Sequence, residues 1–311
     1  MNTPSNAMSE SPRESQVLAP ANIPATRRMY WSVRRELWEY RSIYIAPLAV
    51  AGVFLFGFLI NLIILRRLML HGVWTLDPAQ QHRALDMPYE FAAGLIMGTA
   101  FIVGIFYSLD ALYGERRDRS ILFWKSLPVS DLTIVLSKVT IPLLILPLLS
   151  FAIAVVTQFA MLLLSTAVLL GSGLSVGTLW ARASFIHMSL ILLYHILTVH
   201  GLWYAPLYGW LLLVSAWAPR APFMWAFLPP FVIWGVEKIA FNTSHFLAML
   251  QYRLTGPEPS TTAAQGGTVM DMLSALTLAQ FLSTPGLWVG LVVAAIFLAA
   301  AVRLRRNQEP I

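Results

Sequence analysis

The chain has 311 residues, of which 58% are hydrophobic and only 12% are charged. Its mean hydropathy is +0.68. Several apolar runs approach the ~20 residues that an α-helix needs to cross a bilayer, which excludes an ordinary soluble domain. The runs are also too long and continuous for the strands of an outer-membrane barrel. We therefore predict an all-α polytopic membrane protein, because helices satisfy their own backbone hydrogen bonds inside lipid.

The chain contains no cysteine. Disulfides, cysteine-based zinc sites, iron–sulfur clusters and thiol catalysis are therefore excluded. The formal net charge of +6 does not indicate a nucleic-acid partner, since basic residues of a membrane protein set its topology and contact anionic lipid head groups. We expect the lipid bilayer, and no nucleic acid, around this chain.

Both ends of the chain differ from its apolar middle. Residues 1–26 are rich in Ser, Pro, Asn and Glu and lack the apolar core of a signal peptide, which predicts a disordered cytoplasmic tail. Residues 307–311 form a short polar tail. The stretch between them, 27–306, is expected to form a single transmembrane domain.

Residues 27–41 predict an amphipathic helix in the membrane interface, because apolar side chains recur at helical spacing. These side chains are Met29, Val33, Leu37 and Tyr40. Arg35 and Glu39 have the spacing of an i,i+4 ion pair. Arg34, Arg35 and Trp38 are candidates for contact with a soluble partner. A simple membrane anchor fits the same pattern, and the sequence leaves both interpretations open.

Apolar runs predict six transmembrane helices. In chain order they cover residues 43–65, 89–109, 139–170, 183–217, 223–236 and 286–302. The fourth run is interpreted as one broken or tilted span, because two spans and a loop do not fit into it. Pro142 and Pro147 are expected to bend the third span, and Pro229 and Pro230 the fifth.

Three smaller features accompany the spans. Gly94, Gly98 and Gly104 provide small residues in the second span, which allow close helix approach within one subunit or at a dimer seam. Ser130 is an expected N-cap for the helix that leads into the third span. Residues 269–282 predict a short external or re-entrant helical element before the last span.

Basic residues predict the orientation. Most of the 21 lysines and arginines fall in the N-terminal helix, in residues 111–138 and after the last span. Six spans place these regions on one side, and the positive-inside rule assigns that side to the cytoplasm. We therefore expect a multi-pass protein of the bacterial inner membrane with both termini cytoplasmic. Arg66 and Arg67 depart from this rule.

The chain lacks the sequence motifs by which a transporter binds ATP or couples to an ion gradient. A P-loop needs a lysine directly after glycine, but the three lysines here follow Trp124, Ser137 and Glu237. The span interiors carry almost no charge, which argues against a proton or sodium relay. His187, His195 and His200 lie in or near the fourth run without an HEXXH motif. We expect no catalytic, cofactor-binding or metal-binding residues in this chain.

Residues 111–130 join the second and third spans and contain the run GERRDRSILFWKSLPVS at positions 114–130. This run resembles the membrane subunit of type-2 ATP-binding-cassette (ABC) exporters, in which a Glu-Arg run ending in Pro-(Val/Ile)-Ser follows the second span and forms the cytoplasmic coupling helix. The resemblance extends over about residues 27–306 through the N-terminal interface helix, the six spans and the element before the last span.

The resemblance implies a permease that is not itself an enzyme. Its substrate would move outward on hydrolysis of ATP, bound with magnesium in separate ABC ATPase subunits, and two permease subunits would form a homodimer or another pair. The implied ATPase-contacting residues are Glu115, Arg116, Arg117, Arg119, Phe123, Trp124, Leu127 and Pro128. A membrane-embedded lipid-modifying enzyme is the alternative function, and a non-catalytic membrane scaffold is a third.

Overall fold

A computed structural model describes residues 24–70, 77, 87–126, 129–171, 185–256 and 278–307. Every regular element within these ranges is a helix, which confirms the all-α fold class for the described part of the chain. The first half contains α1 (Ala25–Glu39), α2 (Ser42–Leu70), α4 (Met87–Asp110), α5 (Tyr113–Arg117), α6 (Ser120–Ser126), α7 (Asp131–Thr140), the π-helix η2 (Ile141–Ile145) and α8 (Leu146–Leu170). The second half contains α10 (Phe185–His195), the π-helix η3 (Ile196–Trp203), α11 (Ala205–Trp217), α12 (Pro222–Phe241), α13 (His245–Thr255), α15 (Leu278–Ser283) and α16 (Pro285–Asn307).

Five helical stretches in the described residues are long and apolar enough to cross a membrane. They are Ser42–Leu62, Met87–Arg117, Asp131–Leu170, Pro222–Phe241 and Pro285–Asn307. A further pair, Ser189–Trp203 and Ala205–Trp217, meets at 45° and brings the number to six if the bent pair is one span. The chain is thus a multi-pass membrane protein by the length and composition of its helices.

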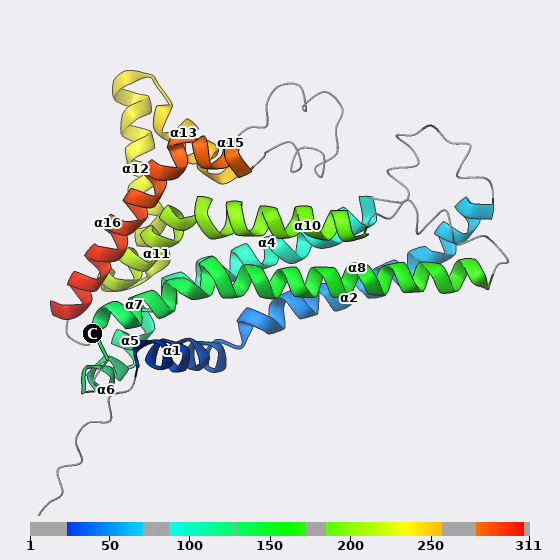
Figure 1. Cartoon of the computed structure of the whole chain (residues 1–311). Coiled ribbons are helices and arrows are strands. Elements are labelled where there is room, and N and C mark those ends of the chain that lie inside the picture. The colour runs from blue at the N-terminus through cyan, green and yellow to red at the C-terminus, as the bar shows by residue number, and fades with distance from the viewer. Residues whose placement is uncertain are drawn as a thin grey trace, which may run out of the picture.

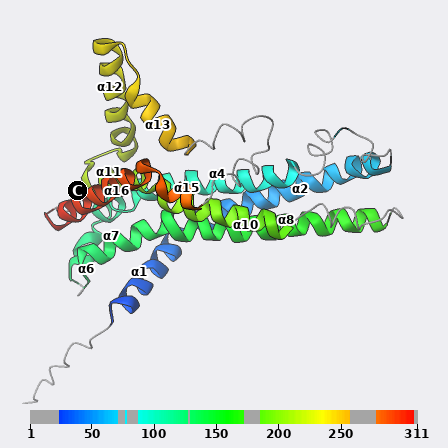
Figure 2. The same cartoon turned by 45° about the horizontal axis from the view of Figure 1, so that its top comes forward.

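The long helices form a bundle with two distinct ends. Helices α2, α4 and α8 run side by side, and α10 lies along them (Figures 1 and 2). At one end, α1, α5, α6 and the C-terminal end of α16 gather, and we call this the α5–α6 end. Helices α12 and α13 form a hairpin that projects away from the bundle, beside the N-terminal end of α16.

The third span shows how its prolines are accommodated. Proline has no N–H and its ring collides with the carbonyl four residues earlier, so it disrupts α-helical bonding. Pro142 lies in η2, where the bonding is π-helical, and Pro147 lies in the first turn of α8. The run from α7 to α8 therefore stays continuous. Ser130 caps it as expected, since its side chain accepts a 3.2 Å hydrogen bond from the Thr133 N–H.

The second π-helix lies directly beside the first. A Cβ added to Gly201 in η3 would lie 3.5 Å from the carbonyl oxygen of Leu143 in η2. Glycine thus brings the two backbones close together at this point. Pro206 opens α11 just after the bend that follows η3. The irregular parts of the third and fourth spans are therefore in mutual contact.

The helices of the C-terminal half extend beyond the expected bounds. The fifth span was expected over residues 223–236, but α12 runs continuously through Pro229 and Pro230 to Phe241. The sequence also gave no indication of α13, which follows α12 directly. The helical element expected over 269–282 lies mostly outside the described residues, which include α15 as its last part.

The surface of the described helices is strongly apolar. On α12, Ala226 is the buried residue, whereas the large apolar side chains are exposed. These are Phe223, Met224, Phe227, Leu228, Phe231, Val232, Ile233, Val236, Ile239 and Phe241. Such a continuous apolar surface is expected where a helix faces acyl chains or another membrane-embedded surface.

Gly104 allows a close approach between α4 and α11, which gives a stability test. A Cβ at Gly104 would lie 2.9 Å from the Tyr208 hydroxyl oxygen, whereas nothing lies within 4 Å of one at Gly98. We expect Gly104→Val to lower the free energy of unfolding by about 1–3 kcal/mol through overpacking. Gly98→Val on the same helix is the control. Thermal unfolding in detergent is the measurement, and equal melting temperatures for the two variants would contradict this packing.

Candidate coupling site

The described part of segment 111–130 contains two short helices, α5 (Tyr113–Arg117) and α6 (Ser120–Ser126), where a coupling helix was expected. Helix α5 ends where the N–H groups of Asp118 and Arg119 turn back to the carbonyls of Gly114 and Arg116. Arg119 has φ 57°, a left-handed conformation that residues other than glycine rarely adopt. The helix is therefore interrupted between α5 and α6.

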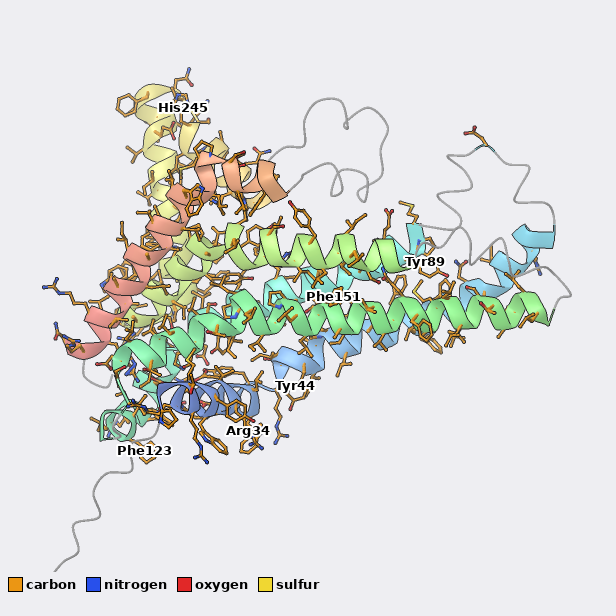
Figure 3. All side chains as sticks on the ribbon, viewed as in Figure 1. Arg34, Tyr44, Tyr89, Phe123, Phe151 and His245 are labelled. Carbon is orange, nitrogen blue, oxygen red and sulfur yellow. The ribbon has the colours of Figure 1, made fainter. Side chains whose placement is uncertain are left out.

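Burial divides the predicted contact residues of this segment into two groups. Glu115 and Arg116 are buried, with exposed fractions of 4% and 5%. Arg117, Arg119 and Phe123 are exposed, and Trp124 is partly exposed. Figure 3 shows Phe123 at the outer edge of the α5–α6 end, in the same region as Arg34. Leu127 and Pro128 lie outside the described residues.

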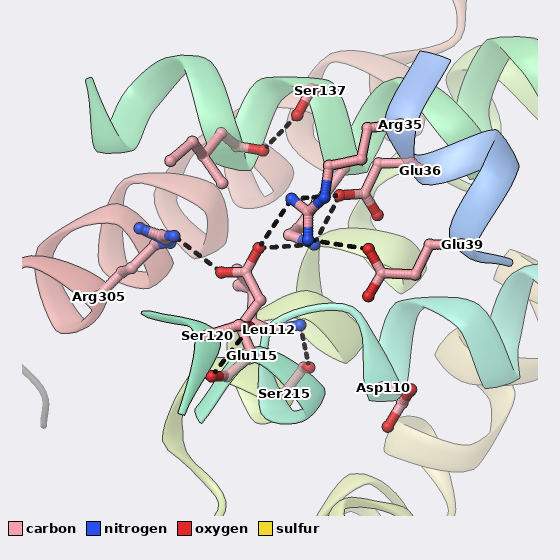
Figure 4. A network of polar contacts seen from close by, with 12 residues as sticks. Arg35, Glu36, Glu39, Asp110, Leu112, Glu115, Ser120, Ser137, Ser215 and Arg305 are labelled. Atoms are coloured by element: carbon pink, nitrogen blue, oxygen red, sulfur yellow. Dashed lines mark hydrogen bonds and ion pairs between the residues drawn. The ribbon is translucent and has the colours of Figure 1, made fainter. Parts of the chain in front are cut away.

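Glu115 joins three helices that are distant in sequence. One of its oxygens lies 2.7 Å from Arg305 Nη2 on α16. The other lies 3.2 Å from Lys138 Nζ on α7 and 3.9 Å from Arg35 Nη1 on α1. Figure 4 shows Glu115 with Arg305 on one side and Arg35 on the other. A carboxylate from the short helix α5 thus ties the N-terminal helix to two of the long apolar runs.

The cationic partners of Glu115 have further anionic partners. Lys138 Nζ lies 2.9 Å from Glu36 Oε1 on α1, and Arg305 Nη1 lies 2.8 Å from Asp131 Oδ1 on α7. The side chains of Glu36, Glu115, Lys138 and Arg305 are at most 3% exposed. We refer to these four residues, with Arg35 and Asp131, as the charge cluster.

The energetics of the charge cluster make it sensitive to the loss of any member. Removing a charge from water costs several kcal/mol per ion, and only well-placed opposite charges offset this cost. Glu115 is flanked by Lys138 and Arg305, while Lys138 is flanked by Glu36 and Glu115. Each charge is therefore held by more than one partner, and the helices that carry them are fixed relative to one another.

Two tyrosines extend this link from α1 to α4. The Tyr107 hydroxyl donates a 2.8 Å hydrogen bond to Glu36, and the Tyr40 hydroxyl donates a 3.1 Å bond to Asp110. The two rings meet edge to face at 4.9 Å. Burial raises the pKa of Tyr40, and the nearby Asp110 carboxylate raises it further, so the hydroxyl stays protonated and able to donate.

Arg116 attaches α5 to the end of α11. Its guanidinium donates to the backbone carbonyls of Ser215, at 3.1 Å, and Ala218, at 2.5 Å. The last carbonyls of a helix have no partner within the helix, so a buried arginine there satisfies acceptors that would otherwise be unpaired. Ser215 also accepts, through its hydroxyl oxygen, the N–H groups of Leu112 and Tyr113. Arg116 thus acts as an internal connection.

Cation–π contacts hold the side chains of Arg34 and Arg35, two residues of α1 that were predicted to contact a partner. The Arg35 guanidinium lies 3.6 Å from the centre of the Trp124 ring, which joins α1 to α6. Arg34 lies over Trp31 and Trp38, at 5.2 Å and 4.7 Å. Trp38 remains 66% exposed. Arg34 and Trp38 thus belong to the surface, whereas Arg35 belongs to the charge cluster. The predicted Arg35–Glu39 ion pair is confirmed at 2.8 Å.

Sequence reasoning missed four members of the charge cluster, namely Glu36, Asp131, Lys138 and Arg305. Two of them carried a local signal. Glu36 is a charged residue next to the apolar stripe of α1, and Lys138 stands inside an otherwise apolar run. A charge at such a position requires a buried partner. The sequence does not show which distant carboxylate or cation provides it.

The histidines of the fourth run form no recognisable site in the described residues. His200 is buried, and its ring lies 5.2 Å from that of Tyr204. The side chains of His187 and His195 lie outside the described residues. Within the described part of the chain, no group of three or more His, Cys, Asp or Glu residues is arranged to hold a metal ion.

Comparisons with protein-family models, with curated proteins and with solved structures found no match to this chain. The functional interpretation therefore depends on the residues and on the geometry of the α5–α6 end.

The charge cluster provides a second stability test. Lys138→Met leaves Glu36 and Glu115 buried without their shared cation, and we expect it to lower the free energy of unfolding by about 3–5 kcal/mol. Lys238→Met makes the same change at an exposed lysine on α12. It should change stability by less than about 0.5 kcal/mol. Thermal unfolding in detergent compares the two.

A double variant separates lost charge pairing from lost packing. Adding Glu36→Gln to Lys138→Met removes one of the two carboxylates that have lost Lys138 as their shared cation, and it should recover part of the stability. If the double variant is no more stable than Lys138→Met alone, charge pairing is not the reason for the destabilisation.

Proposed function

We propose that this chain is the membrane-spanning permease subunit of an ABC exporter. In this proposal, separate ATPase subunits bind ATP and magnesium, and their motion drives a substrate outward. The observation that carries the proposal is the charge cluster, because it connects an exposed loop surface to the ends of several long apolar helices. A surface connected in this way transmits a displacement to the helices rather than absorbing it.

The surface available to the ATPase consists of exposed side chains around the turn between α5 and α6. Arg117 and Arg119 are cationic, and Leu122 and Phe123 are apolar, with Phe123 59% exposed. Exposed apolar side chains beside cations suit an interface with a partner groove that has acidic residues at its rim. Arg34 of α1 lies in the same region (Figure 3), and Arg34 together with Trp38, on whose ring it stacks, extends this surface.

The buried residues of the segment have a different role in the proposal. Glu115 passes a displacement to α7, α16 and α1 through its ion pairs, and Arg116 passes it to the end of α11. The π-helices η2 and η3 are the points where we expect the third and fourth spans to bend, because π-helical segments often occur at functional sites within helices.

The proposal also assigns an orientation and an assembly. The α5–α6 end lies in the cytoplasm together with both termini, in keeping with its concentration of arginine and lysine. The membrane is the bacterial inner membrane. Two permease subunits pair, as a homodimer or with a related subunit, and two ATPases bind at the α5–α6 end.

Exposed residues of the segment test the contact with the ATPase. The combined change Arg117→Glu, Arg119→Glu and Phe123→Asp reverses charge and removes an apolar anchor without touching the charge cluster. We expect it to reduce the ATP-hydrolysing activity that copurifies with the tagged chain by about tenfold or more. Lys238→Glu, near the C-terminal end of α12 and away from the α5–α6 end, is the control. As much ATP-hydrolysing activity should copurify with this variant as with the unchanged chain. Equal activity for the unchanged chain and the triple variant would contradict the proposed contact.

The absence of cysteine allows a direct test of orientation. Single variants Arg119→Cys and Lys238→Cys can be labelled with a membrane-impermeant maleimide without background, because the chain has no other thiol. We expect Arg119→Cys to react only from the cytoplasmic side and Lys238→Cys only from the other side. Labelling of Arg119→Cys from outside intact cells would place the segment out of reach of a cytoplasmic ATPase.

A further inference from the structure

A cavity of about 330 Å³ lies between α11, α12, α13 and α16. Its wall is almost entirely apolar and includes Trp210, Pro230, Leu250, Val293 and Phe297. Among the described residues that line it, Arg253 is the charged one. A larger cavity of about 530 Å³ lies on the hairpin of α12 and α13, and its lining in the described part of the chain contains no charged residue. The smaller cavity thus combines an apolar volume with a single cation, and we call it the Arg253 cavity.

The positive charge of Arg253 has no anionic partner among the described residues. Its guanidinium donates to the carbonyl oxygens of Gly286, at 2.8 Å, and Trp203, at 3.4 Å, and lies over the Trp203 ring at 4.4 Å. These partners are all neutral. They use two of the five N–H donors of a guanidinium. Burial lowers the pKa of Arg253, as expected for a cation removed from water without a counter-charge.

The backbone of α16 is adapted to this arginine. A Cβ at Gly290 would overlap the Arg253 guanidinium, so glycine there allows the arginine to lie against the helix. Gly290 and Arg253 both line the cavity. The guanidinium is therefore held at the cavity wall by a shaped surface and does not extend freely into solvent.

The cavity occupies the half of the molecule away from the charge cluster. Helix α16 has 23 residues, and its axis is about 34 Å long, the thickness of a bilayer core. Arg253 contacts Gly286 at the beginning of this helix, whereas Arg305 lies at its other end. The lining reaches along α16 to Phe297, about 16 Å from Gly286. This depth matches one leaflet of about 15 Å.

We propose that the Arg253 cavity binds a lipid with an anionic head group, whose head pairs with Arg253 and one of whose acyl chains fills the apolar volume. The cavity is at the small end of ligand pockets, which range over roughly 300–1,000 Å³, and this size suits a single chain. The cation at the cavity wall favours an anionic head over a zwitterionic one. The proposal concerns binding by this chain alone and does not depend on an ATPase partner.

Two lysolipids with the same chain test the proposal. The full chain, in nanodiscs of phosphatidylcholine, is titrated with radiolabelled palmitoyl lysophosphatidate and, separately, palmitoyl lysophosphatidylcholine. We expect saturable binding of the anionic lipid, at least about tenfold tighter than that of the zwitterionic lipid. Arg253→Gln should weaken binding of the anionic lipid by about tenfold or more and leave that of the zwitterionic lipid unchanged. Equal affinity for the two lipids in the unchanged chain would overturn the proposal.

Two further variants distinguish the loss of lipid binding at the cavity from a loss of folding. Val293→Trp fills the cavity without removing Arg253 and should abolish saturable binding of the anionic lipid. Arg303→Gln removes an exposed arginine at the far end of α16 and should have no effect. Melting temperatures show which variants are folded. If Arg253→Gln does not fold, Val293→Trp decides, and unchanged binding of the anionic lipid in that variant would contradict occupation of the cavity.

Discussion

The fold depends most on the pairing of Glu115 with Lys138 and Arg305. These charges lie out of water, where each one alone would destabilise the protein by several kcal/mol. Together with Glu36 they hold α1, α5, α7 and α16 in one arrangement. Apolar packing between membrane helices specifies position only weakly, because lipid is as apolar as the helices. The charge cluster supplies the specificity that packing lacks.

The two ends of α16 have contrasting electrostatics. At the α5–α6 end, arginine meets carboxylates and its charge is balanced inside the protein. At the other end, the partners of Arg253 among the described residues are backbone carbonyls and an aromatic ring, beside an apolar cavity. The balanced charges suit a mechanical connection that must persist. The unbalanced charge suits a binding site that an anion completes.

Several features followed directly from local sequence. The helix beginning near Arg27, the Arg35–Glu39 pair and the Ser130 cap depend on residues within one or two turns of each other, and the structure confirms them. The left-handed turn at Arg119 and the helix α13 after Phe241 were not expected from the sequence, since such features depend on contacts with distant elements. The resemblance implied that Glu115 and Arg116 contact the ATPase, whereas the structure places both side chains in buried positions.

The sequence by itself determined that this chain is a helical, multi-pass membrane protein, because the length and apolarity of its runs permit little else in lipid. It also placed a charged segment between the second and third spans. Only the tertiary structure decided which charges of that segment face inward, which are exposed, and which arginine has no anionic partner within the described ranges. Those properties depend on partners up to 190 residues apart in the chain, and local pattern carries no information about such distances.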